Sequence, residues 1–362
     1  MRVAFRVDAS MWMGQGHVMR CAALAWALQL AGASVQFFCR EMPNTLRDWL
    51  LAKGIPVQRL QSASDLEALP EWQEALFAFA PDWLVVDHYE LDARFERASS
   101  LPQMKMLVLD DLANRPHVCD LLLDQNWHED AEQRYAMLLP VHCRQLLGPR
   151  YALLRQEFAD ARQNLQRQTG NIRTLMISFG GSDPGNETSK VLRVLQRFLA
   201  VRKEASVQTE VIVGGLNPNP LVVEALAAEI PGCRCEVHVD DMAMRMSQAD
   251  LLIGAGGTTT WERCCLGLPS ILIATADNQE ALSEAVHQQG AALYLGRSEN
   301  VTEEILLKAL SDLWDNPGLR ASMSQNAMTL VDGLGCQRVV EAMYEFTRER
   351  APGYSDYQVV TT

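Results

Sequence analysis

One histidine of the sequence, His17, stands directly after two closely spaced glycines, Gly14 and Gly16. The apolar run before the glycines predicts a β-strand, and the pattern after them predicts a helix that begins at His17. Glycines let the backbone approach a ligand closely, and the positive end of the helix dipole disfavours the imidazolium form. His17 is therefore a candidate general base, although the spacing equally allows a histidine that only caps or packs the turn. Asp8, at the strand end, could orient the ring or only tie down the loop.

Two further polar clusters stand directly after predicted strands. Side chains at strand ends are well placed to line a ligand-binding cleft, but each cluster alone is more typical of residues that structure a loop. The clusters are Asp87-His88-Tyr89 and Asp110-Asp111, the latter followed by Arg115 and His117. Neither Asp-x-Asp nor H-E-x-x-H occurs, and the histidines lack metal-ligand spacing. We therefore expect neither a metal ion nor a cofactor.

Two glycine-rich loops in the second half of the chain each follow an apolar run and precede a helical pattern. Backbone N–H groups at the start of a helix form a site for an anion such as phosphate, although a plain tight turn would also account for the first loop. That loop lacks the lysine of a Walker site. The loops are Gly180-Gly181-Ser182-Asp183-Pro184-Gly185-Asn186 and Ala255-Gly256-Gly257-Thr258-Thr259-Thr260-Trp261-Glu262.

Polar side chains near the second loop fit other parts of a nucleotide-like ligand. A carboxylate at Glu262 would repel a phosphate, so its natural partner is a pair of ribose hydroxyls. Asn278 and Gln279 carry amides that could bind hydroxyl or acetamido groups of a sugar. A lone pair of amides, however, more often only structures a loop.

Short apolar runs alternate with helical patterns along the whole chain, which predicts parallel sheets built from β-α units. The predicted strands are Val3–Val7, Ser34–Cys39, Trp83–Asp87, Met106–Asp110, Asp120–Leu123, Thr174–Ser178, Thr209–Val213, Cys235–His238, Asp250–Gly254 and Ser270–Ile273. The predicted helices include His17–Ala31, Glu187–Arg202 and Gln337–Arg348.

We expect an α/β protein of two Rossmann-like domains that face a cleft, since ligands of such folds bind at the carboxyl ends of the strands. The first domain would span residues 1–150 and the second residues 151–350. The interdomain connection would fall in Leu147–Phe158 and the polar stretch after it. The last helix could pack back onto the first domain, and residues 351–362 would form a loose tail.

Composition narrows the class of protein. The chain has 362 residues, of which 48% are hydrophobic, enough for two buried cores. No apolar run is long enough to cross a membrane, and the charged N-terminus does not resemble a signal peptide. The net charge of −13 argues against a nucleic-acid partner. The nine cysteines are typical of thiols kept reduced in the cytoplasm.

Several separated motifs, taken in their order along the chain, resemble one family: the UDP-2,4-diacetamido-2,4,6-trideoxy-β-L-altropyranose hydrolases of pseudaminic acid biosynthesis. The resemblance covers most of the chain, and the order of the motifs makes it more specific than any single one. The motifs are FRVDAS with GQGHVMR, VVDHYELD, LDDLANR, GPRYALLRQEF, FGGSDPGN and AGGTTTWERCCLGLP.

The resemblance implies a GT-B fold, a small-molecule UDP-sugar substrate, and metal-free attack of water at C1 with inversion. It makes His17 the general base, supported by Asp8, Gly14 and Gly16. It places Tyr89, Asn278 and Gln279 near the sugar. UDP would be held mostly by the second domain, with Glu262 on the ribose and the backbone near Met242 against uracil. The diphosphate would lie between the two glycine-rich loops, at Gly180, Gly181, Ser182, Gly257, Thr258 and Thr259.

Three other functions share many of these features. A GT-B glycosyltransferase would use the same nucleotide contacts but transfer the sugar to an alcohol acceptor. A UDP-sugar epimerase would release an intact UDP-sugar. A non-catalytic nucleotide-binding protein would bind UDP without turning over any UDP-sugar.

Overall fold

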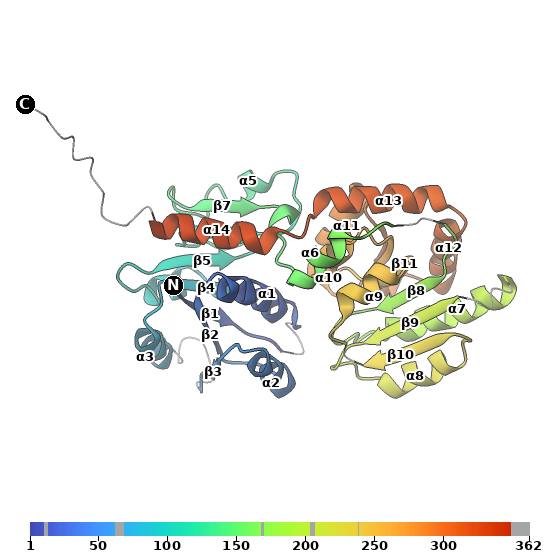
Figure 1. The fold of residues 1–362 in the computed structure, drawn as a ribbon, viewed down its shortest axis with the longest axis horizontal. Coiled ribbons are helices and arrows are strands. Elements are labelled where there is room, and N and C mark those ends of the chain that lie inside the picture. Colours follow the sequence, from blue (N-terminus) through green and yellow to red (C-terminus); the bar gives the residue numbers. More distant parts are fainter. Residues whose placement is uncertain (11–13, 62–68, 168–169, 203–206, 238, 349–362) are drawn as a thin grey trace, which may run out of the picture.

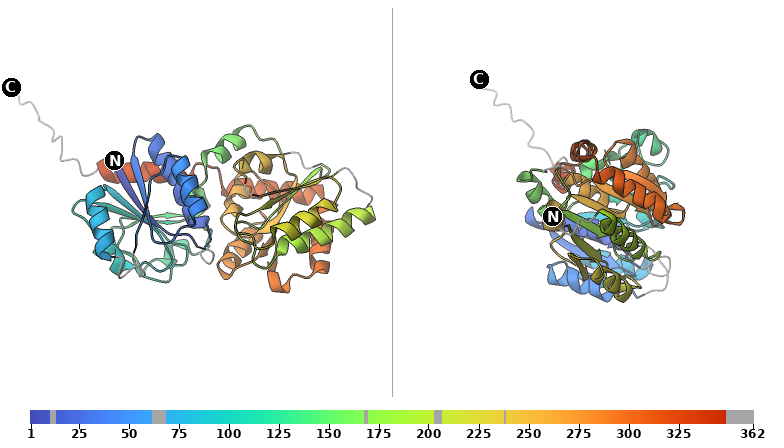
Figure 2. Two further views of the ribbon diagram at one scale, coloured as in Figure 1. Left: turned by 90° about the horizontal axis from the view of Figure 1, so that it is seen from below. Right: turned by 90° about the vertical axis from the view of Figure 1, so that its right-hand side faces the viewer.

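The computed structural model describes residues 1–10, 14–61, 69–167, 170–202, 207–237 and 239–348. They form two α/β domains that lie side by side along the long axis of the molecule (Figures 1 and 2). The predicted fold class, two parallel-sheet Rossmann-like domains, is confirmed. The tail predicted at residues 351–362 lies outside the described residues.

The first domain contains a seven-stranded parallel sheet of order β3-β2-β1-β4-β5-β6-β7. Its central strand β4 reads WLVVD and is buried at every position, as expected for a strand with both faces covered. Because neighbouring strands are parallel, their carboxyl ends share one edge of the sheet; Val7 at the end of β1 pairs with Asp87 at the end of β4. The strands are β1 (Arg2–Val7), β2 (Ser34–Cys39), β3 (Val57–Arg59), β4 (Trp83–Asp87), β5 (Lys105–Leu109), β6 (Leu121–Asp124) and β7 (Arg144–Leu147).

Helices cover both faces of this sheet. One face packs against α1 (Gly16–Leu30), α2 (Asn44–Ala52) and α14 (Gly335–Arg348). The other face packs against α3 (Leu69–Phe79) and α4 (Ala93–Ala98), and the short α5 (Ala131–Arg134) follows β6.

The second domain contains a six-stranded parallel sheet of order β10-β9-β8-β11-β12-β13. Its strands are β8 (Thr174–Ser178), β9 (Gln208–Val213), β10 (Cys233–Val237), β11 (Leu251–Ala255), β12 (Ser270–Ala274) and β13 (Leu293–Arg297). One face packs against α7 (Glu187–Arg202), α8 (Pro220–Ala228) and α12 (Glu303–Trp314). The other packs against α6 (Gln156–Gln163), α9 (Met242–Gln248), α10 (Thr259–Cys265) and α11 (Glu280–Gln288). Helix α13 (Pro317–Leu330) contributes side chains to both cores.

The chain passes between the domains twice. The first passage follows β7 through the short 3-10 helix η1 (Pro149–Tyr151), and the second runs from α13 into α14. The two passages touch, because a Cβ built on Gly335 would lie only 2.2 Å from the carbonyl oxygen of Ala152, an approach that glycine alone allows. Helix α14 then lies along the first domain (Figure 1), where the Tyr344 hydroxyl donates to the Ala31 carbonyl oxygen at 2.8 Å.

The ten predicted strands all exist, within two residues at each end, as do the three named helices. Three strands were not predicted: β3, β7 and β13. These strands lie at sheet edges, and β3 is mostly exposed, so they lack the continuous apolar run that identifies an interior strand. No helix among the described residues is long and apolar enough to cross a membrane.

Candidate functional site

The two domains meet at the carboxyl ends of their sheets. A Cβ built on Gly16, at the start of α1, would lie 3.1 Å from Thr258 Cγ2 in the second domain. A Cβ built on Gly181 would lie 3.8 Å from the side chain of Gln15. The loop before α1 therefore touches both glycine-rich loops of the second domain, which the sequence analysis assigned to one ligand.

His17 lies beside this junction in a defined orientation. Its Nδ1 is 2.6 Å from Asp87 Oδ1, at the end of β4. Its ring packs edge-on against Tyr89, with centroids 4.5 Å apart. The other ring nitrogen, Nε2, has no hydrogen-bond partner among the residues that the structure describes, and it is not one of the fully buried unpartnered atoms. With Nδ1 held as a donor to a carboxylate, Nε2 is free to accept a proton.

Asp87 is the anchor of this arrangement. It is fully buried and accepts two hydrogen bonds from Arg20, both of 2.7 Å, and one from the Cys21 thiol. Burial alone would raise the pKa of the Asp87 carboxyl, but the Arg20 guanidinium and His17 hold it well below its usual range. Asp87 is therefore an anion that fixes both the tautomer and the position of the His17 ring.

Asp8 does not orient His17, so that possibility is wrong. Its carboxylate is 2.7 Å from Arg6 Nη1 and accepts from the backbone N–H groups of Arg40 and Glu41. These contacts tie the end of β1 to the loop after β2. His88 Nε2 lies 3.4 Å from Asp8, and His88 Nδ1 accepts from the Glu90 N–H, so neither ring nitrogen of His88 is free to act as a base.

The cluster after β5 is divided between two tasks. Asp110 accepts from Arg115, whose guanidinium also donates to the His88 carbonyl oxygen, both at 2.7 Å. Buried His117 lies 2.6 Å from Glu96 through Nδ1 and 3.8 Å from Asp110 through Nε2. These four side chains join the loops after β4 and β5 and are structural. Asp111 instead accepts from Arg20 Nη1 at 3.0 Å and so belongs to the His17 cluster.

The loop before α10 presents unpaired backbone donors to the junction. The N–H groups of Gly257, Thr258 and Thr259 donate to no other described residue, and Thr258 makes no side-chain cap. A Cβ built on Gly257 would meet nothing nearer than Gln279 Nε2 at 3.9 Å. Behind the loop, buried Arg263 donates to Thr260 Oγ1 and to the carbonyl oxygen before the glycines. This backbone can receive an anion without rearranging.

The loop before α7 was also predicted to bind an anion, but its helix start is already occupied. Asp183 caps the helix by accepting from the N–H groups of Glu187 and Thr188 at 2.8 and 3.0 Å. Since these donors already face a carboxylate, the start of α7 is not an open anion site. Only the glycine end of the loop, Gly180-Gly181-Ser182, lies near the junction, through the contact with Gln15.

The glycine end of this loop rests on a glycine that the sequence analysis did not single out. A Cβ built on Gly214, after β9, would lie 2.2 Å from the carbonyl oxygens of both Gly180 and Gly181. The Leu216 N–H then donates to Gly181 at 3.0 Å. The position of Gly214 directly after a predicted strand could have identified it as a place where another loop approaches closely.

Glu262 and Met242 lie on neighbouring helices, α10 and α9. The Glu262 side chain is 17% exposed, and its nearest cation is Arg155 Nη2 at 3.8 Å. Burial raises its pKa, and Arg155 offsets part of that effect. Met242 is half-buried at the first turn of α9 and packs against the core that contains α10.

The two predicted sugar-binding amides have different roles. Asn278 Nδ2 donates to the Tyr89 hydroxyl at 3.2 Å, across the domain junction. Gln279 Oε1 instead accepts from the Thr275 N–H at 2.9 Å, which ties its own loop. The structure therefore brings Asn278, Tyr89 and His17 together, and leaves only the Nε2 end of Gln279 near Gly257.

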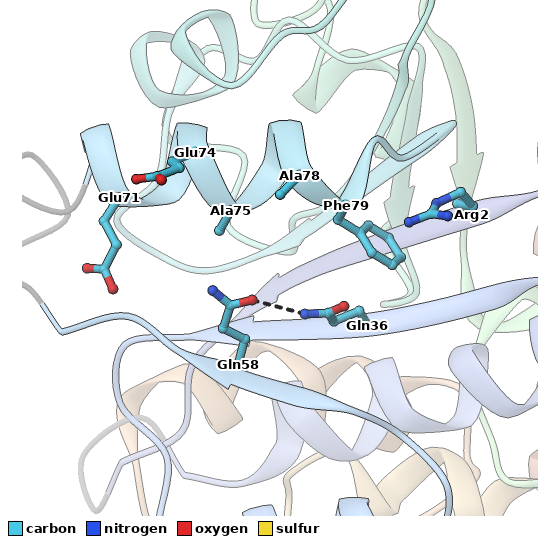
Figure 3. Close-up of a pocket in the computed structure, with 8 residues that line it drawn as sticks. All are labelled: Arg2, Gln36, Gln58, Glu71, Glu74, Ala75, Ala78 and Phe79. Carbon is cyan, nitrogen blue, oxygen red and sulfur yellow. Dashed lines mark hydrogen bonds between the residues drawn. The ribbon is translucent and has the colours of Figure 1, made fainter.

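No group of three or more His, Cys, Asp or Glu residues in the described part of the chain could hold a metal ion. A groove of about 480 Å³ lies between α3 and strands β2 and β3 (Figure 3). It includes Arg2, at the amino end of β1, and is therefore remote from His17 at the opposite edge of the sheet.

The amino-acid sequence is similar to proteins of sugar and polysaccharide biosynthesis. Residues 178–335 match the glycosyltransferase family 28 C-terminal domain. The spore coat polysaccharide biosynthesis protein SpsG of Bacillus subtilis is 30% identical over 55% of this chain, and the chain spans only 57% of that protein. The UDP-2,4-diacetamido-2,4,6-trideoxy-β-L-altropyranose hydrolase of Campylobacter jejuni is 28% identical over 80% of this chain and 97% of its own length.

Solved structures show the same fold at lower identity. MurG of Acinetobacter baumannii superimposes with a TM-score of 0.66 at 18% identity, over 95% of this chain and 100% of that one. A putative UDP-N-acetylglucosamine 2-epimerase from Listeria monocytogenes gives 0.60 at 16% identity, over 96% and 97%. The chain thus has the fold of these solved structures, and residues 178–335, most of its second domain, match the glycosyltransferase family 28 C-terminal domain.

Proposed function

We propose that the protein hydrolyses a UDP-sugar, with His17 as the general base that activates water. The observation that carries this proposal is the 2.6 Å contact between His17 Nδ1 and the Asp87 carboxylate, while Nε2, beside the domain junction, has no hydrogen-bond partner in the described part of the chain. A histidine oriented by a buried carboxylate is the usual arrangement of a catalytic base. The likeness to the C. jejuni hydrolase over nearly all of that protein suggests the substrate, UDP-2,4-diacetamido-2,4,6-trideoxy-β-L-altropyranose.

UDP would be held by the second domain. The N–H groups of Gly257, Thr258 and Thr259, which have no partner among the described residues, would bind the diphosphate, with Gly180, Gly181 and Ser182 on its other side. Glu262 would accept hydrogen bonds from the ribose hydroxyls, and the backbone near Met242 would contact uracil. Gly14 and Gly16 would bring the first domain close to this ligand, because Gly16 already lies against Thr258.

The sugar would lie between the domains, near Tyr89 and Asn278, with Gln279 at its edge. Burial, together with the negative charge of Asp111, raises the pKa of Tyr89 to about 12. The phenol therefore stays protonated at neutral pH. Its oxygen accepts from Asn278, which leaves its O–H to donate to a sugar oxygen.

In the proposed reaction the water oxygen forms a bond to C1 of the sugar, and its proton passes to His17 Nε2. The bond between C1 and the UDP oxygen breaks, and its electron pair leaves with UDP. Backbone donors at the diphosphate stabilise this departing charge, so no separate acid is required. Asp87 stabilises the imidazolium that forms. Attack opposite the leaving group inverts the configuration at C1.

A GT-B glycosyltransferase is the second candidate, favoured by the family 28 domain match and by the fold of MurG. It would use the same UDP contacts but would need an alcohol acceptor in place of water. UDP binding without turnover of any UDP-sugar would favour a purely nucleotide-binding protein.

The decisive experiment is NMR of the purified protein with UDP-2,4-diacetamido-2,4,6-trideoxy-β-L-altropyranose and no acceptor. Hydrolysis predicts free UDP and free diacetamido sugar, released first as the inverted anomer. An unchanged UDP-sugar that is consumed only when an alcohol is added would favour the glycosyltransferase. Recovery of an epimerised UDP-sugar would favour an epimerase.

We also propose a cytoplasmic location, where UDP-sugars would be available to the enzyme. All nine cysteines are free thiols in the structure, and six of them are buried. Unpaired thiols are typical of a reducing compartment.

A further inference from the structure

Asp111 occupies a position between two contacts that join the domains. It follows β5, which lies between β4 and β6 in the sheet. After β4, the Tyr89 hydroxyl accepts from Asn278 at 3.2 Å. After β6, Asn126 Oδ1 accepts from Trp261 Nε1 at 3.3 Å. Asp111 therefore lies at the sheet edge that faces the second domain, with a domain-bridging residue on each side.

Within the described part of the chain, only one oxygen of the Asp111 carboxylate accepts a side-chain hydrogen bond. Oδ2 accepts from Arg20 Nη1 at 3.0 Å, whereas Oδ1 has no partner among the residues that the structure describes. The side chain is 14% exposed, and Oδ1 is not one of the fully buried unpartnered atoms. Arg20 is itself buried and held by two hydrogen bonds to Asp87, so the carboxylate is fixed in place with one acceptor open.

An ionised carboxylate can only accept hydrogen bonds, so its partner must be a donor. A phosphate would be repelled, which excludes the diphosphate of UDP as the group that Asp111 meets. The Asp111 charge is close enough to Tyr89 to add to the effect of burial on the pKa of that phenol. Tyr89 is one of the residues proposed to contact the sugar, so the open oxygen lies in the sugar's part of the junction.

We infer that Asp111 determines sugar specificity, with Oδ1 accepting a hydrogen bond from an amide N–H on the sugar ring. This inference rests on the proposed function, because it assumes that a UDP-amino sugar binds at the junction. It adds a recognition group for acylated amino sugars in the first domain, on the opposite side from the UDP-binding loops.

Substitution by asparagine tests the hydrogen-bond direction. Because Arg20 can only donate, the amide oxygen introduced by Asp111→Asn would face Arg20, and the amide NH₂ group would face the sugar. Two donors would then oppose each other. Asp111→Ser removes the charge but keeps a hydroxyl that can accept, so it should lose less affinity than Asp111→Asn.

Calorimetry would use His17→Asn as the parent, so that the UDP-sugar stays intact, and would compare UDP with UDP-2,4-diacetamido-2,4,6-trideoxy-β-L-altropyranose. Adding Asp111→Asn should weaken binding of the UDP-sugar about 10- to 100-fold, the worth of one hydrogen bond to a charged group, and leave UDP affinity unchanged. Asp48→Asn removes the same charge from an exposed position on α2 and should change neither affinity.

The outcomes separate the inference from the function on which it rests. If the parent binds UDP but not the UDP-sugar, the proposed function fails. If the parent binds both and Asp111→Asn weakens them equally, or weakens neither, Asp111 is structural and the inference is overturned. Equal losses in the asparagine and serine variants would also overturn it, because the direction of the hydrogen bond would then be irrelevant. Thermal unfolding of each variant checks that the domain is intact.

Discussion

The two sides of the domain junction are built from different chemistry. On the first-domain side, side chains from α1, the end of β4 and the loop after β5 form one hydrogen-bonded network: His17, Arg20, Asp87 and Asp111. On the second-domain side, the loop before α10 offers backbone N–H groups and hydroxyls, with Glu262 one turn further on. The first arrangement is suited to moving a proton and the second to holding an anion. The proposed function requires this division.

Disabling only the proton-transfer side should have the largest effect on turnover. His17→Asn and Asp87→Asn should each lower kcat about 10²–10⁴-fold, the usual worth of general-base catalysis, because one removes the base and the other its orienting anion. UDP affinity should stay unchanged, since the nucleotide contacts are assigned to the other domain. Steady-state kinetics and calorimetry measure both.

Circular dichroism serves as the control, because Asp87→Asn leaves the buried Arg20 with a single charged partner, Asp111. A folded His17→Asn variant with near-normal kcat would make His17 a structural residue. The base would then have to be sought elsewhere, although not at His88, whose ring nitrogens are engaged.

The complementary change affects the anion-holding side. Glu262→Ala should weaken UDP binding by about 1.5–3 kcal/mol, the scale of a hydrogen bond to a charged group, with kcat at saturating substrate changed little. Glu304→Ala, an exposed glutamate at the start of α12 on the far face of the sheet, is the matched control. Unchanged UDP affinity in Glu262→Ala would remove this residue from the site.

A third change tests the contact between the two sides. Gly16→Ala places a Cβ 3.1 Å from Thr258 Cγ2, closer than ordinary packing allows. It should therefore hold the domains slightly apart and lower kcat/KM about 3- to 10-fold, because small displacements of reacting groups are costly. Adding Thr258→Ser removes the opposing methyl group and should restore part of the loss. If the double variant is no better than Gly16→Ala, steric contact at this point is not the cause.

The smallest effect on turnover should come from His117, which is structural. Burial alone would lower the pKa of His117, but the carboxylates of Asp110 and Glu96 raise it to about 9. The folded state thus binds this proton more tightly than the unfolded chain. The resulting stability is complete below about pH 6.5 and is lost as the pH rises through 9.

Urea unfolding at pH 6.5 and 9.5 would measure this effect against His117→Gln, which cannot titrate. The unmodified protein should lose on the order of 2–3 kcal/mol more than the variant over this range. Equal losses in the two proteins would show that His117 is not charged in the folded state.

The fold was predictable because interior strands of parallel sheets are continuous apolar runs, as in WLVVD of β4 and TLMIS of β8. The short edge strands were not, because their polar, exposed residues resemble loops. One backbone feature was also predictable: Gly16, beside His17, lies against Thr258 in the loop before α10.

The partners of His17 were harder to predict. Asp8 and Asp87 both end strands, and chain distance favours Asp8. The choice depends on the sheet order, which places β4 directly beside β1, and on α1, which carries His17 and Arg20 on one face three residues apart. In the same way, the glycine-rich sequence does not show that Asp183 caps its own helix and so occupies the N–H groups that an anion would need.

In the proposed reaction, water activated on the first-domain side attacks the sugar carbon while the second domain holds UDP. Turnover of the UDP-sugar in ¹⁸O-labelled water, stopped early and analysed by mass spectrometry and ³¹P NMR, shows which bond breaks. We expect the label in the hydroxyl on the anomeric carbon and none in the released UDP. Label in UDP would mean attack at phosphorus, and the role assigned to His17 and Asp87 would have to be abandoned.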